Sequence, residues 1–261
     1  MVEAIANGIE DKLIDGLSFK MNPGASYVVD RRSLTFHPQG SNIYKTTSGT
    51  KLIRILLTGD NWLDTSTFRI MFDVRNNETN AAKKLYVLGG PHCFFRRMRI
   101  LAAGQLVEDI DNYNRIHEMM SVLTSADSRA NQAAEAFGYH WDTGGGSYNG
   151  SVTQGITGGT ALTVLFKPLS GLLNQNKMLP IRYSQIIIEL ELADEPTAPI
   201  MDPAASVADF YTVDNTSTDW QIENVQVKVD VCTLDSALDN SYAQHLLSGK
   251  SLPISYNIFV S

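Results

Sequence analysis

The residues best suited to acid–base or metal chemistry are five histidines spread along the chain: His37, His92, His117, His140 and His245. None of them stands in an HxH or HExxH spacing, and no CxxC pair is present. Such spacings bring ligating atoms together on one face of an element. The pair His117-Glu118 on an expected helix would permit general-base chemistry, but a packed or surface histidine explains it better. The sequence therefore predicts no metal site.

Candidate nucleophiles and paired carboxylates give no stronger indication of catalytic activity than the histidines do. Neighbouring residues on a strand point to opposite faces, so His92 is not expected to activate the Cys93 thiol. Glu189 and Glu191 share a strand face, as glycosidase carboxylates could, yet a solvated outer face accounts for them. No GxSxG, GxxxxGK[ST] or GxGxxG motif occurs. We expect no enzymatic activity, no catalytic residue and no cofactor.

The one basic cluster consists of Arg96, Arg97 and Arg99. These arginines could contact an acidic neighbour or nucleic acid, or they could pair with the protein's own carboxylates across a turn. The carboxylates suggested for that pairing are Glu108, Asp109 and Asp111. The net charge of −7 favours internal pairing or a contact between subunits, because nucleic-acid binders usually carry a basic patch or arm.

Aromatic residues complete the set of candidate contact residues. Tryptophan and phenylalanine are enriched at the buried centres of interfaces, although burial in the protein's own core is the default for them. The candidate intersubunit contacts are Phe94, Phe95, Arg96, Arg97, Arg99, Trp141 and Trp220.

The elements that must position these side chains are mostly strands, because apolar and polar residues alternate in many segments. The clearest alternation lies at 67–75, 184–193 and 224–232. Weaker strands are expected at 25–31, 34–37, 51–57, 93–103, 105–110 and 162–166. Helical spacing of apolar residues predicts helices at 111–123 and 235–247, the second capped by Asp235 or Ser236, and a weaker one at 128–136. The apolar stripe of the first helix would hold Tyr113, Ile116, Met120 and Leu123.

Two long stretches separate the later strands. Residues 138–159 are rich in Gly, Ser, Thr and Asn, and residues 194–219 contain Pro196, Pro199 and Pro203. Loops of this length usually carry function or contact partners. We expect intersubunit contacts there. About eight alternating strands joined by such loops predict an all-β protein, an antiparallel β-sandwich of the jelly-roll type with short helices in its loops.

The bulk composition agrees with this class. The chain has 261 residues, of which 43% are hydrophobic and only 19% are charged, so one large β-domain can bury a core. Two cysteines, Cys93 and Cys232, do not make a disulfide framework. No basic n-region precedes an apolar run at the N-terminus, and no stretch reaches the length of a membrane span. We expect synthesis in the cell without a secretory signal.

Three segments resemble the double jelly-roll major capsid proteins of polinton-like viruses and virophage-like elements. The first, at 86–119, has a strand, the turn GQLVEDI and a helix with YNRIHEM. The second, at 166–193, has LPIRY leading into a long strand. The third, at 239–259, resembles the passage from the first jelly roll into the second. The resemblance covers most of residues 24–261, but this chain is about half as long as such subunits.

The resemblance implies a structural capsid protein found in the virion. Three chains, with two barrels each, would form a pseudo-hexagonal capsomer of an icosahedral shell, and the partners would be copies of the chain and penton or minor capsid proteins. An internal membrane beneath the shell is possible in this family, and strong direct nucleic-acid binding is not expected. Residues 1–23 would be an N-terminal segment, 24–234 the first jelly roll, and 235–261 a linking helix and the opening strand of a second.

Two other functions fit a β-sandwich. A lectin-like carbohydrate-binding module would need exposed aromatics with Asp and Asn on one concave face, or a calcium site. A jelly-roll enzyme of the cupin type would need a histidine-rich metal set, which the sequence does not offer.

Overall fold

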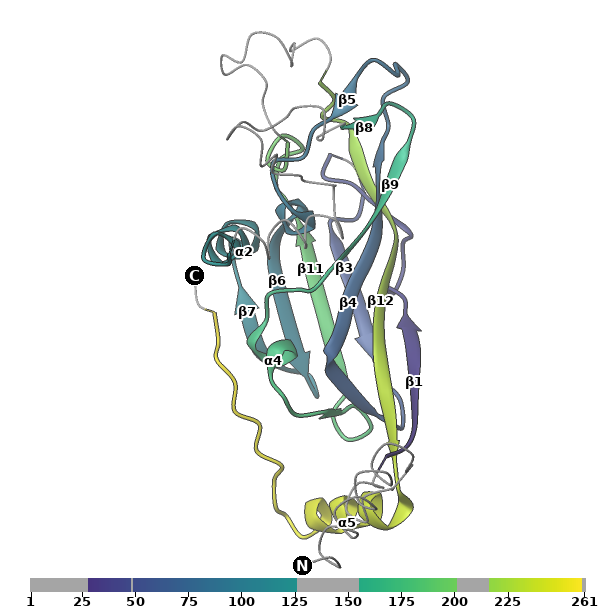
Figure 1. Cartoon of the computed structure of the whole chain (residues 1–261), viewed down its shortest axis with the longest axis vertical. Coiled ribbons are helices and arrows are strands. Elements are labelled where there is room, and N and C mark those ends of the chain that lie inside the picture. The colour runs from purple at the N-terminus through teal and green to yellow at the C-terminus, as the bar shows by residue number, and fades with distance from the viewer. Residues whose placement is uncertain (1–27, 48, 126–154, 201–215, 260–261) are drawn as a thin grey trace, which may run out of the picture. The chain divides into compact units, whose positions relative to one another are not determined.

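The computed structural model describes residues 28–47, 49–125, 155–200 and 216–259 (Figure 1). The chain divides into two units. One holds residues 32–231 together with 253–261, and the other holds residues 1–31 together with 232–252. The larger unit contains the bodies of two antiparallel sheets, and the smaller contains a helix near the C-terminal end of the chain.

The first sheet is centred on two long strands that lie side by side, β4 and β12. β1 and β2 pair with β12, whereas β9 and β10 pair with β4. The bounds of these strands are β1 (Val28–Phe36), β2 (Ile43–Tyr44), β4 (Trp62–Asn76), β9 (Ala161–Phe166), β10 (Leu179–Pro180) and β12 (Trp220–Leu234). This sheet forms one layer of the fold.

The second sheet has the order β3–β11–β6–β7. Its strands are β3 (Leu52–Leu57), β6 (Phe95–Ala102), β7 (Gln105–Ile110) and β11 (Ile186–Leu192). A separate short pair joins β5 (Lys84–Leu85) to β8 (Ile156–Thr157). Segments far apart in the sequence are therefore neighbours in both sheets.

The order of the eight longest strands defines the topology. Numbered along the chain, strands one, eight, three and six form the first layer, and strands two, seven, four and five form the second. Two facing four-stranded layers connected in this way are a jelly roll. The predicted all-β, antiparallel jelly-roll class with about eight strands is confirmed, as is each strand expected at 67–75, 184–193 and 224–232.

The core lies between the layers because every second side chain of the central strands points inward. On β4, Phe68, Ile70, Phe72 and Val74 are fully buried, as the alternation predicted. The ring of Phe72 meets three other aromatic rings edge-to-face, with centroid separations of 5.4–6.5 Å. These partners are Phe94, Phe95 and Phe166.

The strand expected at 93–103 begins later than predicted. Pro91–Phe94 form a short 3₁₀ helix, η1, and β6 starts at Phe95. Proline fixes its own backbone and favours the first turn of a helix, which explains the difference. The turn after β6 was predicted correctly: Ala103 and Gly104 have φ of 48° and 82°, the left-handed backbone that suits a two-residue hairpin turn.

Both long helices were predicted, but one packs differently from the expectation. The helix α2 (Tyr113–Val122) buries Tyr113, whereas Met120 and the following Leu123, expected in its apolar stripe, are exposed. The helix α5 (Ser236–Leu247) is capped by the Asp235 side chain, which accepts from the N–H of Ala237 at 3.0 Å. A short α4 (Gly171–Asn174) precedes β10. No described helix has the length and apolar character needed to cross a bilayer.

Candidate functional site

The roots of both long loops lie at the same end of the barrel, beside β5 and β8 (Figure 1). β8 lies near the end of the first predicted loop, at Ile156–Thr157, and pairs with β5. The second loop is anchored by two bridges, from Lys84 to Thr216 and from Val87 to Ile200. The described ends of the two loops are thus fastened to one connection, residues 83–88. The predicted contact loops share one rigid base.

A buried asparagine at the end of β4 ties these roots together. The Asn76 side chain donates from Nδ2 to the carbonyls of Lys83 at 3.1 Å and Ile156 at 2.8 Å. Its Oδ1 accepts from the Ser217 hydroxyl at 2.7 Å and from the N–H of Glu78 at 3.2 Å. Asn76 and Ser217 are fully buried. One side chain therefore satisfies backbone and hydroxyl groups from three separate connections.

Replacing Asn76 with alanine is expected to lower the free energy of unfolding by about 1–3 kcal/mol, because buried partners lose their hydrogen bonds. Amide hydrogen exchange should also become faster in the β5–β8 pair. Asn77→Ala is the matched control, since Asn77 makes an exposed bond to Asp219 at 3.0 Å; a loss under about 0.5 kcal/mol is expected there. Equal losses in chemical denaturation would contradict the role given to Asn76.

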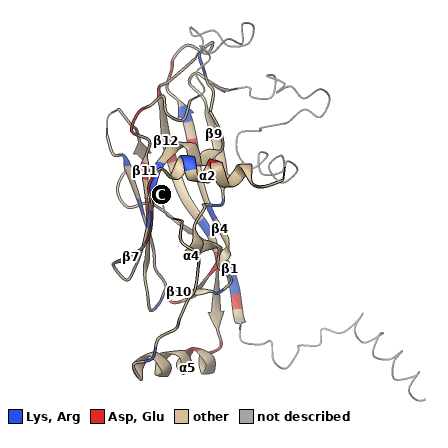
Figure 2. Ribbon diagram, turned by 90° about the vertical axis from the view of Figure 1, so that its left-hand side faces the viewer, with Lys and Arg blue, Asp and Glu red and all other residues tan. Residues whose placement is uncertain are grey.

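The outer face of the second sheet carries the basic cluster. Glu189 on β11 lies opposite Arg54 on β3 and Arg99 on β6. Its carboxylate forms an ion pair with each guanidinium group, with N–O distances of 3.7 Å to Arg54 and 3.1 Å to Arg99. Positive and negative residues are interspersed along the strands (Figure 2). This row of alternating charges crosses three strands and stabilises their pairing.

The other two arginines pair with aspartates. Arg97 donates to both carboxylate oxygens of Asp109, at 2.8 Å and 2.6 Å. This hydrogen bond, with the nearby positive charges, holds the pKa of Asp109 below its ordinary value. Arg96 pairs with Asp194 at 2.9 Å and with Asp111 at 3.6 Å. The interpretation that these arginines pair with the protein's own carboxylates is confirmed for Asp109 and Asp111.

Glu108, the third carboxylate suggested for the arginines, lies elsewhere. It is buried, and it accepts from the N–H of Gly171 at 2.8 Å and from the Ser170 hydroxyl. Alternation along β7 places Glu108 and Asp109 on opposite faces: Asp109 lies opposite Arg99, whereas Glu108 lies opposite the buried Ile100. The suggestion that Glu108 pairs with the arginines was therefore wrong.

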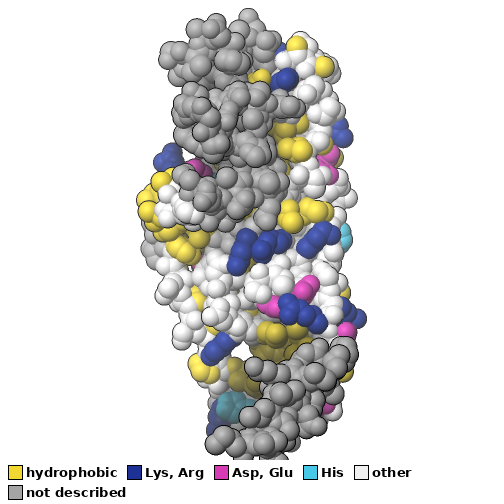
Figure 3. Space-filling view, in the orientation of Figure 1, with side chains coloured by type: hydrophobic (Ala, Val, Ile, Leu, Met, Phe, Trp, Pro, Cys, Tyr) yellow, Lys and Arg dark blue, Asp and Glu magenta, His cyan; other side chains and the backbone are white. Residues whose placement is uncertain are grey.

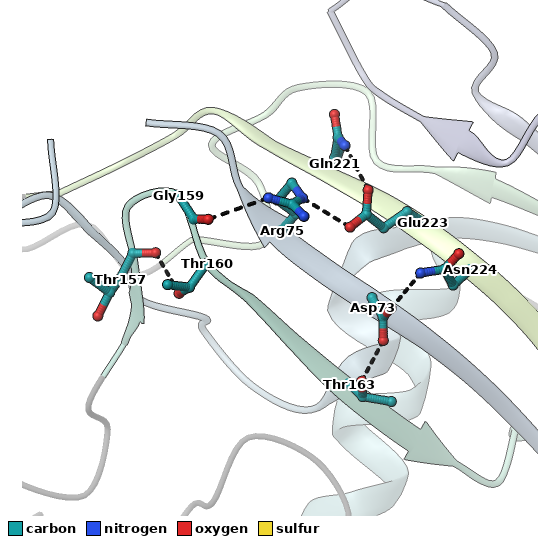
Figure 4. Close-up of polar contacts among 9 residues, drawn as sticks. All are labelled: Asp73, Arg75, Thr157, Gly159, Thr160, Thr163, Gln221, Glu223 and Asn224. Carbon is teal, nitrogen blue, oxygen red and sulfur yellow. Dashed lines mark hydrogen bonds and ion pairs between the residues drawn. The ribbon is translucent and has the colours of Figure 1, made fainter. Parts of the chain in front are cut away.

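The outer face of the first sheet is also internally paired (Figure 4). Arg75 donates to Glu223 at 2.9 Å, and Gln221 donates to the other oxygen of the same carboxylate at 2.9 Å. Asp73 accepts from Asn224 at 2.7 Å and from the Thr163 hydroxyl. These contacts join β4 to both of its neighbours, β9 and β12, so their side chains stiffen the sheet.

The candidate aromatic contacts lie in the core. Phe94 and Phe95 are 0% exposed and Trp220 is 2% exposed, and the Trp220 indole donates to the carbonyl of Pro196 at 2.8 Å. Of the two interpretations left open for these aromatics, the structure shows burial in the protein's own core. Trp141 and the helix predicted at 128–136 lie outside the described residues. Among the candidates that the structure describes, the three arginines lie at the surface.

Two histidines that are far apart in the sequence stack on each other. The rings of His92 and His117 lie 3.9 Å apart at 12°, and His92 Nε2 lies 2.9 Å from a carboxylate oxygen of Glu118. Cys93 is buried beside them, and burial raises the pKa of its thiol, which opposes nucleophilic chemistry. Pro91–Phe94 is a helical turn rather than a strand, so the opposite-face argument for His92 and Cys93 was wrong.

The nitrogen lone pairs of two stacked imidazole rings lie in two parallel planes. They therefore cannot point at the same metal ion. Within residues 28–47, 49–125, 155–200 and 216–259, no group of three or more His, Cys, Asp or Glu side chains is arranged to hold a metal. The sequence reasoning missed the His92–His117 contact, because the 24 positions between them carry no spacing signal. Only the packing of α2 on η1 brings the two rings together.

An exposed apolar face on α2 is the second feature that sequence reasoning missed. Met119, Val122 and Leu123 are 67%, 57% and 79% exposed, and Met120 is 37% exposed. Figure 3 shows hydrophobic side chains gathered at its left edge, at the level of α2. Clusters of exposed apolar side chains commonly mark interaction surfaces. The helix turns its apolar side outward because Tyr113 and Ile116 already fill the contact with the core.

No family model matches this sequence, and no curated protein does. Solved structures match in fold. VP54 of PBCV-1, as fitted into a cryo-EM reconstruction of the virophage Sputnik, matches with a TM-score of 0.52 and 13% identity, over 87% of this chain and 48% of its own.

Two further solved structures match at the same level. A chain of the quasi-atomic model of the PBCV-1 virus capsid matches with a TM-score of 0.53 and 14% identity, over 87% of this chain and 48% of its own. The Sputnik virophage structure at 3.5 Å resolution matches with a TM-score of 0.52 and 8% identity, over 81% of this chain and 49% of its own. The chain thus spans about half the length of these solved chains, and the likeness is one of fold.

Proposed function

We propose that this protein is a structural subunit of an icosahedral virus-type capsid and acts by self-assembly rather than by catalysis. The observation that carries the proposal is the jelly-roll fold, which matches a chain of the PBCV-1 capsid model with a TM-score of 0.53 over 87% of this chain. The protein would reside in the virion.

The internal pairing of both outer faces supports a building-block role. Arginines that already bind Asp109, Asp194 and Glu189 have little capacity left for a charged ligand, and nucleic-acid binding should be weak. The core and the paired surfaces make a rigid barrel. Contacts with other copies are then left to segments that are not committed to the barrel.

We assign those contacts to the loops at 138–159 and 194–219 and to the exposed apolar face of α2. The described ends of both loops meet around Asn76. Met119 and Leu123 supply apolar area that a neighbouring copy would cover. The proposed assemblies are homotrimeric capsomers, which would meet penton or minor capsid proteins, with or without a membrane beneath the shell.

Removing residues 201–215 and joining the ends with a short Gly/Ser linker is expected to leave a folded barrel that no longer forms capsomers. The base at Ile200 and Thr216 is retained, so the circular dichroism spectrum and the melting temperature should change little. Mass in solution and electron microscopy then compare the deletion with the parent chain. Trimers or closed particles from the parent, and monomers from the deletion, are the expected result.

A parent chain that stays monomeric at every concentration would contradict the proposed self-assembly. A deletion variant that assembles like the parent would show that residues 201–215 make no contact needed for capsomer formation. Met119→Asp, which places a charge on the α2 face, tests the second surface in the same assay. Binding of the monomer on a glycan array would favour the carbohydrate-binding alternative instead.

A further inference from the structure

Residues 253–259 lie against the barrel although they belong to no strand or helix (Figure 1). Ile254, Tyr256 and Phe259 are half-buried and pack on the hydrophobic core, whereas Ser255 and Asn257 are exposed and Ile258 is 53% exposed. This segment, which we call the strap, was predicted to open a strand with Ile258 on the same face as Tyr256. The predicted alternation holds over residues 254–257 and fails at Ile258 and Phe259, and the strap makes no strand pairing.

The strap is held by specific contacts. The Tyr256 hydroxyl donates to the carbonyl of Val107 on β7 at 3.1 Å. Lys177 Nζ donates to the carbonyl of Pro253 at 2.9 Å. A Cβ at Gly171 would lie 1.5 Å from the carbonyl oxygen of Asn257, so the strap backbone passes where only glycine leaves room.

The surface beneath the strap is fixed by groups of the barrel. Glu108 on β7 accepts from the N–H of Gly171 at 2.8 Å and from the Ser170 hydroxyl. The Tyr113 hydroxyl on α2 accepts from the N–H of Leu169 at 2.9 Å. We call β7 and residues 169–173 the seat. These bonds do not involve the strap, so the seat is held together by contacts of its own.

We propose that the seat is a docking surface for an extended segment with apolar residues at alternate positions and a tyrosine, and that its occupant is the strap of this chain. The strap belongs to the same unit as the seat, and its contacts within that unit are those of Pro253, Ile254, Tyr256 and Phe259. A strap bound in this way stays on the seat after the backbone before it is cut. This inference does not depend on the proposed capsid function.

The test uses the full chain with a specific protease site inserted after Lys250, where residues 248–251 are exposed. After complete cleavage, native mass spectrometry is expected to find the C-terminal fragment still bound to the rest of the protein. Excess synthetic peptide with the sequence of residues 251–261 should exchange with the fragment, and a scrambled peptide should not. Release of the fragment on cleavage would overturn the proposal.

Gly171→Ala is the sharpest variant because its Cβ meets the strap backbone and little else. Gly171 is the first residue of α4 and its φ is not in the left-handed region, so alanine suits the helix itself. We expect at least tenfold less retained fragment. Gly59→Ala is the matched control: its Cβ would make one ordinary contact, 3.5 Å from Ile181 Cδ1, and retention should equal the parent's.

Tyr256→Phe removes only the hydroxyl bond to Val107 and is expected to reduce retention by a smaller factor. If the chain with the protease site does not fold, hydrogen exchange on the uncut chain takes its place. There, amides of residues 254–259 should exchange more slowly in the parent and in Gly59→Ala than in Gly171→Ala. Equal exchange in all three proteins, like equal retention, would overturn the proposal.

Discussion

Replacing Phe72 with alanine is expected to lower the free energy of unfolding by about 3–5 kcal/mol, the usual cost of emptying a buried aromatic site. Phe72 is fully buried on β4. Its ring makes edge-to-face contacts with Phe95 at 5.4 Å and Phe166 at 6.1 Å, which come from the opposite layer and from the neighbouring strand. The cavity left by the missing ring would therefore lie between the two layers, at the centre of the core.

Chemical denaturation of the parent and the variant measures this loss directly. Phe72→Leu refills much of the space and should cost less than Phe72→Ala. Leu247→Ala is the surface control, because Leu247 is 87% exposed and its loss should stay within about 0.5 kcal/mol. A Phe72→Ala loss no larger than that of Leu247→Ala would show that this cluster is not the centre of the core.

Acidification is the second large effect expected, and His117 is its source. Burial lowers the pKa of His117 to about 3, and the adjacent His92 contributes in the same direction. In the unfolded chain His117 titrates near its ordinary value of 6.5. Between these two values the unfolded state binds the extra proton, so the free energy of unfolding falls as the pH is lowered.

The slope from His117 is at most about 1.4 kcal/mol per pH unit between pH 6.5 and pH 3, and it vanishes outside that window. The rings facing His117 are those of His92, Tyr113 and Phe166, and the nearest carboxylate is Glu118, which opposes the shift. Stability measured by denaturation at several pH values should show this slope in the parent.

His117→Gln removes the titrating ring and is the matched comparison. The variant is expected to be less stable at neutral pH, because the stacked contact is lost, yet its stability should fall less steeply on acidification. NMR of the parent should show a His117 ring that stays neutral down to about pH 4. Parallel pH profiles for the two proteins would contradict the assignment of this slope to His117.

Most strands could be predicted from the sequence because alternation is a local property. A strand with one buried face must place apolar residues at every second position, and β4, β11 and β12 do so over residues 68–74, 188–192 and 225–231. The hairpin turn at Ala103 and Gly104 and the Asp235 cap are local for the same reason. These features depend on neighbours within a few residues.

The errors have a common cause in packing between distant segments. The sequence did not show that Phe94, Phe95 and Trp220 are core residues, because an aromatic at a strand end suits a core or an interface equally well. It placed Met120 and Leu123 on a buried stripe, whereas the space under α2 is already filled by Tyr113 and Ile116.

The sequence by itself determined the fold class, the positions of the main strands and the pairing of an acidic chain's few arginines with nearby carboxylates. Only the tertiary structure decided the order of the strands, the stacking of His92 on His117, the burial of Glu108 and the seat around Gly171. The physical reason is that propensity and alternation act within a few residues. Contacts across 25 to 149 positions depend on how distant elements pack on each other.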